Sequence, residues 1–186
     1  MSDKDRDSGM SEAFLVESAR VVTLIGEIDE WAARKVTYSL YHLSAEEDFS
    51  KPITLIINCD GGNVFESHGM YDTIKTLRAA GHVIHGRVHG HAMSAAVFVL
   101  QACTTRTMTA NGMLMAHGLK EFRVGDIRNM EADAEAANKV LDIQVRMLCE
   151  RGTRGEAYWR ELLRDQLPHY YTAEEALKEG LVDAIE

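Results

Sequence analysis

Apolar and polar residues follow one another along this chain in blocks that predict strands alternating with helices. Short apolar or alternating runs, typical of buried strands, cover 20–25, 53–58, 82–89, 105–110 and 113–116. Stretches with the helical spacing of apolar residues cover 27–43, 64–79, 94–102, 126–151 and 159–163, and a last helix starts at the capping-box segment 172–175. Strands that alternate with helices predict an α/β fold with parallel crossovers.

The segment 126–151 differs from the other predicted helices because its apolar stripe is too wide for a solvated spacer. The stripe consists of Met130, Ala134, Ala137, Val140, Leu141, Ile143, Val145 and Leu148. We expect it to pack against a partner subunit. The chain has two prolines, and we find no linker or internal repeat. We therefore predict one domain over 18–186, preceded by a polar, flexible N-terminal arm over 1–17.

Composition and charge limit the classes of partner and the cellular location that we expect for this protein. The chain has 186 residues and a net charge of -9, and an acidic surface argues against nucleic acid, whose phosphates need a basic patch. No apolar run reaches the roughly 18 residues of a membrane span. The N-terminus lacks the apolar core of a secretory signal, so we expect a cytoplasmic protein without a membrane partner. The three widely spaced cysteines, Cys59, Cys103 and Cys149, are predicted to be free buried thiols.

Ser94 is the first candidate for catalytic chemistry. It lies in the segment GHAMSAA, between a predicted strand and an apolar helix. There a hydroxyl could act as a nucleophile if a base lies within hydrogen-bond reach. His117, which follows the apolar run 113–116, is the candidate base. The structural alternatives are a helix-capping serine and a hydrogen-bonded core histidine.

Two backbone amides near Ser94 could stabilise a developing oxyanion. The N–H of Ala95 lies at a predicted helix N-terminus, where the helix dipole favours negative charge. Gly62 belongs to the turn DGGN and is the second candidate donor, because glycine lets the backbone approach a ligand closely. Many Asp and Glu residues could orient the histidine, and the sequence alone does not choose among them.

Four histidines in one segment raise the question of a metal site. His82, His85, His89 and His91 lie close together, and the last three could share one side of a strand. No Cys, Asp or Glu among them completes a usual ligand set. We therefore predict no metal, and we expect no other cofactor.

Four segments, taken in order, resemble the caseinolytic Clp protease (ClpP) family. They are ITLIINCDGGNVFESHGMYDTIK, GHAMSAAVFVLQA, NGMLMAHG and YYTAEEALKEGLVDAI, and the resemblance runs from about residue 18 to 185. It implies that Ser94 is the nucleophile and His117 the base. It also implies a ClpP/crotonase-like fold, an α/β fold of twisted parallel sheets built from repeated ββα units, with a protruding handle made by the long helix.

The resemblance further implies an assembly. In this family handles interdigitate, so that two seven-membered rings of identical subunits stack into a hollow chamber with the sites inside. An ATP-dependent unfoldase feeds unfolded polypeptides into the chamber. This chain has no phosphate-binding Gly-Lys-Thr loop, so the ATP would belong to that partner.

The chain departs from the family pattern at three positions. Asp60 stands where the family turn has proline, and Ala95 stands where a methionine follows the nucleophile. Pro168 stands where the family has its catalytic aspartate. Asp165, three residues upstream, could replace that acid after a local loop shift; otherwise the site is a Ser-His dyad or is inactive.

Three interpretations follow. The first is a serine endopeptidase that works through an acyl-enzyme inside an oligomeric chamber. The second is a structural subunit that kept the fold and lost hydrolysis, which the missing aspartate motivates. The third is a crotonase-like acyl-CoA enzyme, which the pairing of Ser94 with His117 disfavours because that chemistry usually relies on carboxylates.

Overall fold

The computed structural model describes residues 15–16, 19–45, 51–119, 127–165 and 167–186. Most of the predicted arm over 1–17 lies outside the described residues. Its residues Leu15–Val16 form a short strand, β1, that pairs antiparallel with the strand beginning at Val21. No helix in the described ranges is long and apolar enough to cross a membrane.

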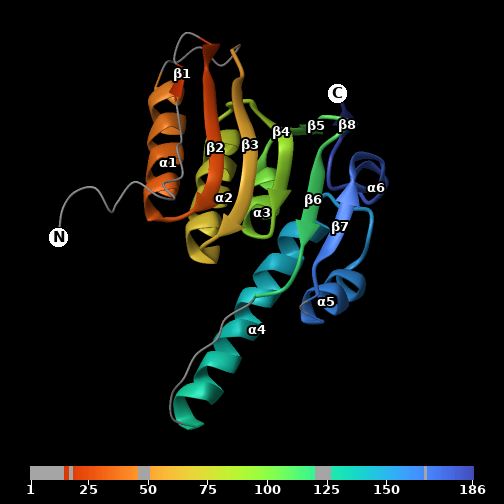
Figure 1. The fold of residues 1–186 in the computed structure, drawn as a ribbon. Coiled ribbons are helices and arrows are strands. Elements are labelled where there is room, and N and C mark those ends of the chain that lie inside the picture. Colours follow the sequence, from red (N-terminus) through yellow and green to blue (C-terminus); the bar gives the residue numbers. More distant parts are fainter. Residues whose placement is uncertain (1–14, 17–18, 46–50, 120–126, 166) are drawn as a thin grey trace, which may run out of the picture.

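A parallel sheet forms the centre of the molecule, as the alternating pattern predicts (Figure 1). Each connection between neighbouring parallel strands must cross over the sheet, and most of these crossovers are helical. The parallel strands, in spatial order, are β2 (Val21–Ile28), β3 (Ile53–Gly62), β4 (Ile84–Met93), β5 (Thr105–Met108) and β8 (Ala184–Ile185).

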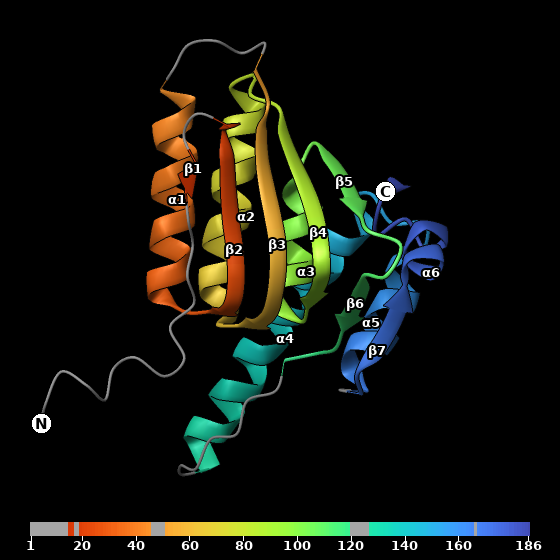
Figure 2. The same ribbon diagram turned by 45° about the horizontal axis from the view of Figure 1, so that its top comes forward.

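Strand β4 has different partners along its length. Its first half pairs with β5, whereas its last three residues pair in parallel with β6 (Met113–Ala116). A further strand, β7 (His169–Thr172), pairs antiparallel with β6. The sheet therefore divides at β4, and the residue that follows β4 lies beside β6 rather than β5 (Figures 1 and 2).

Three helices cover one face of the sheet. They are α1 (Glu30–Ser44), α2 (Val64–Ala79) and α3 (Ala95–Ala102). Alternate residues of β3, including Ile53, Leu55 and Ile57, are 0% exposed, whereas those between them are partly exposed. The side chains of Asp29 and Asn63 accept hydrogen bonds from the first turns of α1 and α2, and so fix where these helices begin.

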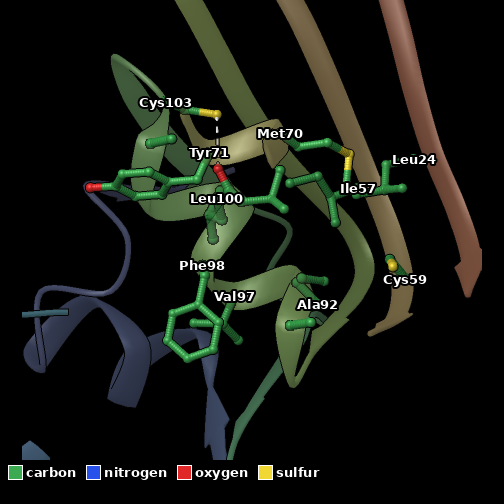
Figure 3. Packing of buried hydrophobic residues seen from close by; sticks show 14 of the residues in the cluster. Leu24, Ile57, Cys59, Met70, Tyr71, Ala92, Val97, Phe98, Leu100 and Cys103 are labelled. Atoms are coloured by element: carbon green, nitrogen blue, oxygen red, sulfur yellow. Dashed lines mark hydrogen bonds between the residues drawn. The ribbon is translucent and has the colours of Figure 1, made fainter. Parts of the chain in front are cut away.

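Helix α3 is apolar except for Gln101 and is buried along its whole length. Figure 3 shows Leu100 directed toward Ile57 of β3 and Met70 of α2, while Phe98 points away from them. Because α3 is fixed by packing on both β3 and β4, its N-terminus at Ser94 has a fixed place relative to the sheet.

The long helix α4 (Ile127–Cys149) protrudes from the body, as the family resemblance implies (Figures 1 and 2). The expectation that its whole stripe meets a partner subunit is wrong for the end nearer the body. Val140, Leu141, Val145 and Leu148 are at most 9% exposed within this chain, because this end of α4 packs against α3 and α5 (Glu156–Arg164). Ala134 is exposed, and the side chain of Met130 lies outside the described residues.

Element boundaries differ from the prediction at a few places. Strand β2 runs on through Ile28, with an irregularity between Gly26 and Glu27, so α1 begins three residues later than expected. Trp31 has helical spacing with the core residues of α1, yet it is 45% exposed. Lys35 Nζ lies over its ring, 4.8 Å from the ring centroid. Helix α6 (Ala173–Lys178) starts at the predicted capping box of Thr172 and Glu175.

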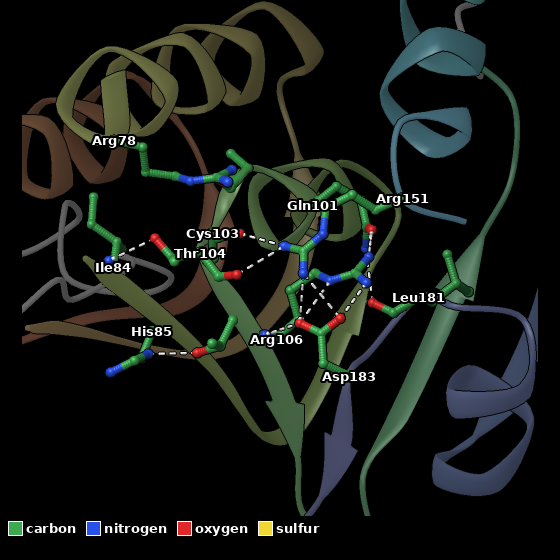
Figure 4. Close-up of polar contacts among 12 residues, drawn as sticks. Arg78, Ile84, His85, Gln101, Cys103, Thr104, Arg106, Arg151, Leu181 and Asp183 are labelled. Carbon is green, nitrogen blue, oxygen red and sulfur yellow. Dashed lines mark hydrogen bonds and ion pairs between the residues drawn. The ribbon is translucent and has the colours of Figure 1, made fainter. Parts of the chain in front are cut away.

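A cluster of Arg106, Arg151 and Asp183 holds the C-terminal strand in place. Arg106 is 2% exposed and donates to Asp183 from Nη2, at 2.6 Å, and from its backbone N–H, at 2.7 Å (Figure 4). Arg151 donates to the same carboxylate and to the carbonyl oxygen of Cys103. All three cysteines are free, as predicted; Cys59 and Cys103 are buried and Cys149 is partly exposed.

Candidate active site

Ser94 occupies the turn between β4 and α3, and its backbone is in an unusual conformation. Its φ is 53° and its ψ is -120°. Among the described residues only Arg20 and Ser94 are non-glycine residues with positive φ. Such a conformation costs on the order of 1–3 kcal/mol and is found where the surrounding packing imposes it, often at a functional site. A serine on a strained strand-to-helix turn is also the arrangement that exposes the nucleophile in α/β-hydrolases.

The Ser94 hydroxyl does not cap the helix. The N-cap position of α3 is Ser94 itself, yet its side chain makes no capping hydrogen bond. The backbone N–H of Ser94 donates to the carbonyl oxygen of Met115 in β6, at 2.6 Å. The structural alternative of a capping serine is therefore not what this geometry uses, and the partly exposed hydroxyl is left for chemistry.

The glycine-containing end of β3 lies directly against the Ser94 turn. Gly61 has a φ of 88°, and a Cβ atom there would lie 2.6 Å from the carbonyl oxygen of Met93 and 2.8 Å from Ser94 Cβ. Only glycine tolerates both the backbone angle and this approach. The two segments therefore set each other's position.

Gly62 and Ala95, the predicted oxyanion donors, come from these two segments. Gly62 lines the same hollow as Ser94. Ala95 is the first residue of α3, so its N–H is one of the amides that have no acceptor within the helix. Their use as an oxyanion hole stays a prediction.

His117 follows β6 and lines the hollow together with Ser94. Its ring Nδ1 lies 2.5 Å from the carbonyl oxygen of Gly118. A carbonyl only accepts, so Nδ1 carries the proton, and in the neutral ring Nε2 keeps its lone pair. That is the tautomer in which Nε2 can act as a base. Gly118 packs on the backbone of Leu163 in α5, where a Cβ atom would collide with the Leu163 carbonyl.

Asp165 is not brought to His117 in this structure. Its carboxylate lies 3.0 Å from His169 Nε2 and accepts from the Leu167 N–H at 2.9 Å. The Leu167 amide, with His169, holds the pKa of Asp165 below its usual value. The register pairs Ala116 with His169, so one further step places Pro168 opposite His117. This agrees with Pro168 standing at the family's acid position.

The residues around Ser94 and His117 enclose a hollow of about 280 Å³. Sequence reasoning did not find several of its walls. Phe98 comes from α3, and Val140 and Gln144 come from α4. Gln144 was detectable as the one strongly polar residue at a buried position within the apolar half of α4, where it is 2% exposed.

A thiol close to the site is not a rival nucleophile. Cys59 is buried in β3, and its sulfur accepts from the Gly61 N–H at 3.4 Å. Burial raises the pKa of the Cys59 thiol to about 12. At neutral pH it is therefore protonated, and a protonated thiol is a poor nucleophile.

Two of the four histidines weighed as metal ligands have separate hydrogen-bond partners, whereas Nε2 of His89 is buried with none among the described residues. His91 Nε2 lies 2.9 Å from Asp60 Oδ1, and His85 Nδ1 lies 2.5 Å from Thr105 Oγ1. Across the part of the chain that the structure describes, no group of three or more His, Cys, Asp or Glu residues is arranged to hold a metal ion.

Comparison with known proteins places these observations in a family. The sequence model described as Clp protease matches residues 5–186. A curated relative, the ATP-dependent Clp protease proteolytic subunit 4 of Rhodococcus jostii (strain RHA1), is 31% identical over 169 residues. These residues cover 89% of this chain and 84% of the relative. The resemblance carried by the four sequence motifs is confirmed over nearly the whole chain.

Proposed function

This chain belongs to the Clp protease family, and we propose that it is a serine-type endopeptidase subunit acting on unfolded polypeptides. The observation that carries the proposal is the Ser94 turn. A serine with strained backbone and a hydroxyl not used for capping lines one hollow with His117, whose Nδ1 is held by a carbonyl oxygen. The same pairing favours a hydrolase over the acyl-CoA chemistry considered above.

The reaction proceeds through an acyl-enzyme. Ser94 Oγ attacks the scissile carbonyl carbon while His117 Nε2 takes the hydroxyl proton. The protonated imidazole then gives that proton to the leaving amine, and the peptide bond breaks. Water, deprotonated by the same Nε2, then attacks the ester carbonyl; the C–O bond to Ser94 breaks, the imidazolium returns its proton to Ser94 Oγ, and the peptide leaves as a carboxylic acid. The amides of Gly62 and Ala95 stabilise the oxyanion that forms in both steps.

The carbonyl of Gly118 takes over part of the role of a triad acid. It fixes the tautomer and the orientation of His117 through Nδ1, but it carries no full charge to stabilise the imidazolium. Replacing a triad aspartate by a neutral residue lowers turnover by about four orders of magnitude when the wrong tautomer results. Because the right tautomer is kept here, we expect turnover below that of a full triad but above that limit.

The proposed setting is an oligomeric chamber in the cytoplasm. We take the subunit to assemble with copies of itself into two stacked seven-membered rings and to receive substrate from an ATP-dependent unfoldase. Two features support this. The helix α4 protrudes from the body, and the relative from Rhodococcus jostii is named as the proteolytic subunit of an ATP-dependent protease.

Cleavage of an unstructured fluorogenic peptide tests the proposal. We expect slow hydrolysis by the assembled protein, and loss of hydrolysis in Ser94→Ala and in His117→Ala. Ser44→Ala is the matched control, because that hydroxyl is exposed and bonds only to the Tyr41 carbonyl at the end of α1. Hydrolysis that persists in Ser94→Ala would overturn the proposal.

A further inference from the structure

Gln144 is a buried polar residue among those that line the hollow beside Ser94. The residue is 2% exposed and lines the hollow together with Ser94 and His117. Its side-chain Oε1 is buried and has no hydrogen-bond partner among the described residues. Buried polar groups in proteins are nearly always paired, so an unpaired amide in a residue that lines a cavity can, once the amide is turned toward the cavity, take its partner from a ligand.

The other walls of the hollow define what kind of partner fits. Apolar side chains contribute much of the surface, and they include Phe98, Leu119 and Val140. None of the described residues that line the hollow is Asp, Glu, Lys or Arg. A charged substrate side chain would lose its hydration there without meeting a counter-charge. Among the described walls of the hollow, an uncharged partner for Gln144 avoids this cost.

The size of the hollow limits the partner further. A water molecule occupies about 30 Å³ in the liquid, so a hollow of about 280 Å³ holds one side chain of moderate size with its backbone. A carboxamide offers both a donor and an acceptor. It can therefore pair with Gln144 whichever way the amide of Gln144 is turned.

We propose that this hollow selects peptides with a carboxamide side chain, Asn or Gln, beside the scissile bond, and that Gln144 is the residue that binds it. The proposal rests on the proposed function, since it names the substrate class of the same site. Sites that pair with a substrate N–H or O–H discriminate strongly against analogues that lack it, because their own buried group is then left unpaired.

Asparagine and leucine have nearly the same shape, so a peptide pair with Asn or Leu at that position isolates the hydrogen bond. We expect kcat/KM to favour the Asn peptide by roughly tenfold or more. Gln144→Met, which keeps the length of the side chain and removes the amide, is expected to abolish or reverse this preference. Asn138→Leu is the matched control, because that amide is exposed on the same helix and bonds within it, to Ala134.

A second measurement does not depend on turnover. In Ser94→Ala protein, fluorescence anisotropy of the same two labelled peptides is expected to show roughly tenfold tighter binding of the Asn peptide, lost in Ser94→Ala/Gln144→Met. Equal affinity for the two peptides would overturn the inference. Cleavage without preference would leave the endopeptidase proposal standing and this inference refuted. Preferential binding of the Asn peptide without any cleavage by the wild-type protein would support this inference and refute the endopeptidase proposal.

Discussion

At the scale of single residues, the backbone of Ser94 has a cost that the rest of the fold must offset. A residue with a side chain at φ 53° and ψ -120° clashes with its own peptide groups, whereas glycine does not. The hydrogen bond from the Ser94 N–H to Met115 and the packing of Gly61 hold the turn in place. The strain is therefore a property of the site that stability measurements can detect.

Two substitutions that both remove the hydroxyl measure this strain. Ser94→Gly relieves it, and Ser94→Ala does not. Glycine also gives the unfolded chain more entropy, which offsets part of the gain. We therefore expect the free energy of unfolding of Ser94→Gly to exceed that of Ser94→Ala by about 1 kcal/mol. Chemical denaturation of the two variants provides the comparison. A Ser94→Ala protein at least as stable as Ser94→Gly would show that the turn is not strained.

Gly61 offers a second test beside the nucleophile. Gly61→Ala brings a Cβ atom to 2.8 Å from Ser94 Cβ, so the two segments must move apart. A displacement of about 1 Å at a catalytic group costs on the order of a hundredfold in kcat, and we expect that loss in peptide hydrolysis.

Gly69→Ala is the control for Gly61→Ala. Gly69 lies within α2 with no heavy atom within 4 Å of an added Cβ, so activity is expected to stay and stability to rise by about 0.5–1 kcal/mol. Equal activity of the two variants would show that the close approach of Gly61 does not position Ser94.

Sequence patterns were enough to single out Ser94 and His117 as candidates, because each stands at the end of an apolar run and within a recognisable motif, and the structure brings both to one hollow. They were not enough to find the Gly118 carbonyl or the positive φ of Ser94. Backbone conformation and backbone acceptors at such a point depend on how β6, α3 and α5 pack together. Asp165 was the nearest acid in sequence, yet its position at the end of α5 directs it to His169.

At the scale of elements, β8 depends on the cluster around Asp183. The pKa of this carboxyl is the balance of burial, which raises it, and of the hydrogen bonds and charges of Arg106 and Arg151, which lower it below its usual 3.8. The lowered pKa means that folding favours the ionised form. Its stabilisation is present above the unfolded value and is lost as pH falls below about 4.

Asp183→Asn leaves the guanidinium of Arg106 buried without its counter-charge. We expect a loss of about 2–3 kcal/mol in free energy of unfolding at pH 7, which is less than the roughly 3–5 kcal/mol usual for a fully buried pair because Asp183 is partly exposed. The loss should shrink at pH 3. Asp142→Asn is the control, since Asp142 forms an exposed pair with Arg160, and its effect should stay within about 1 kcal/mol. Equal losses for the two variants would contradict the assignment.

Most elements were predictable because helices and parallel strands leave local patterns. Helix α2 was expected over 64–79, and the structure has it at Val64–Ala79. Strand β7 was not expected. Its four residues after Pro168 show no clear alternation, and they become a strand only by pairing with β6. Long-range pairing of this kind has no signal in a single short segment.

At the scale of the whole molecule, α4 divides into two parts. The part near the body belongs to the core of this chain and carries Gln144, whereas residues 132–139 of the outer part are exposed or partly exposed. Because the two parts share one helix, contacts that the outer part makes with another copy would affect the position of Val140 and Gln144, which line the hollow. Assembly and activity are therefore expected to be coupled.

Ala134→Arg tests the outer part of α4. It adds bulk and charge to the stripe, so we expect native mass spectrometry to show loss of the stacked double ring together with loss of peptide hydrolysis. Ala132→Arg adds the same group to the same exposed region, on the opposite side of the helix from Ala134, and is expected to leave the assembly intact. Disruption by both variants alike, or by neither, would contradict a handle contact through the stripe.

The central claim is that the hydroxyl of Ser94 is a nucleophile activated by His117. Labelling of the assembled protein with a fluorophosphonate, followed by mass spectrometry of its peptides, tests it most directly. We predict one modified site, Ser94, with labelling absent in Ser94→Ala and greatly slowed in His117→Ala. Labelling at another residue, or no labelling of the intact assembly, would contradict the claim.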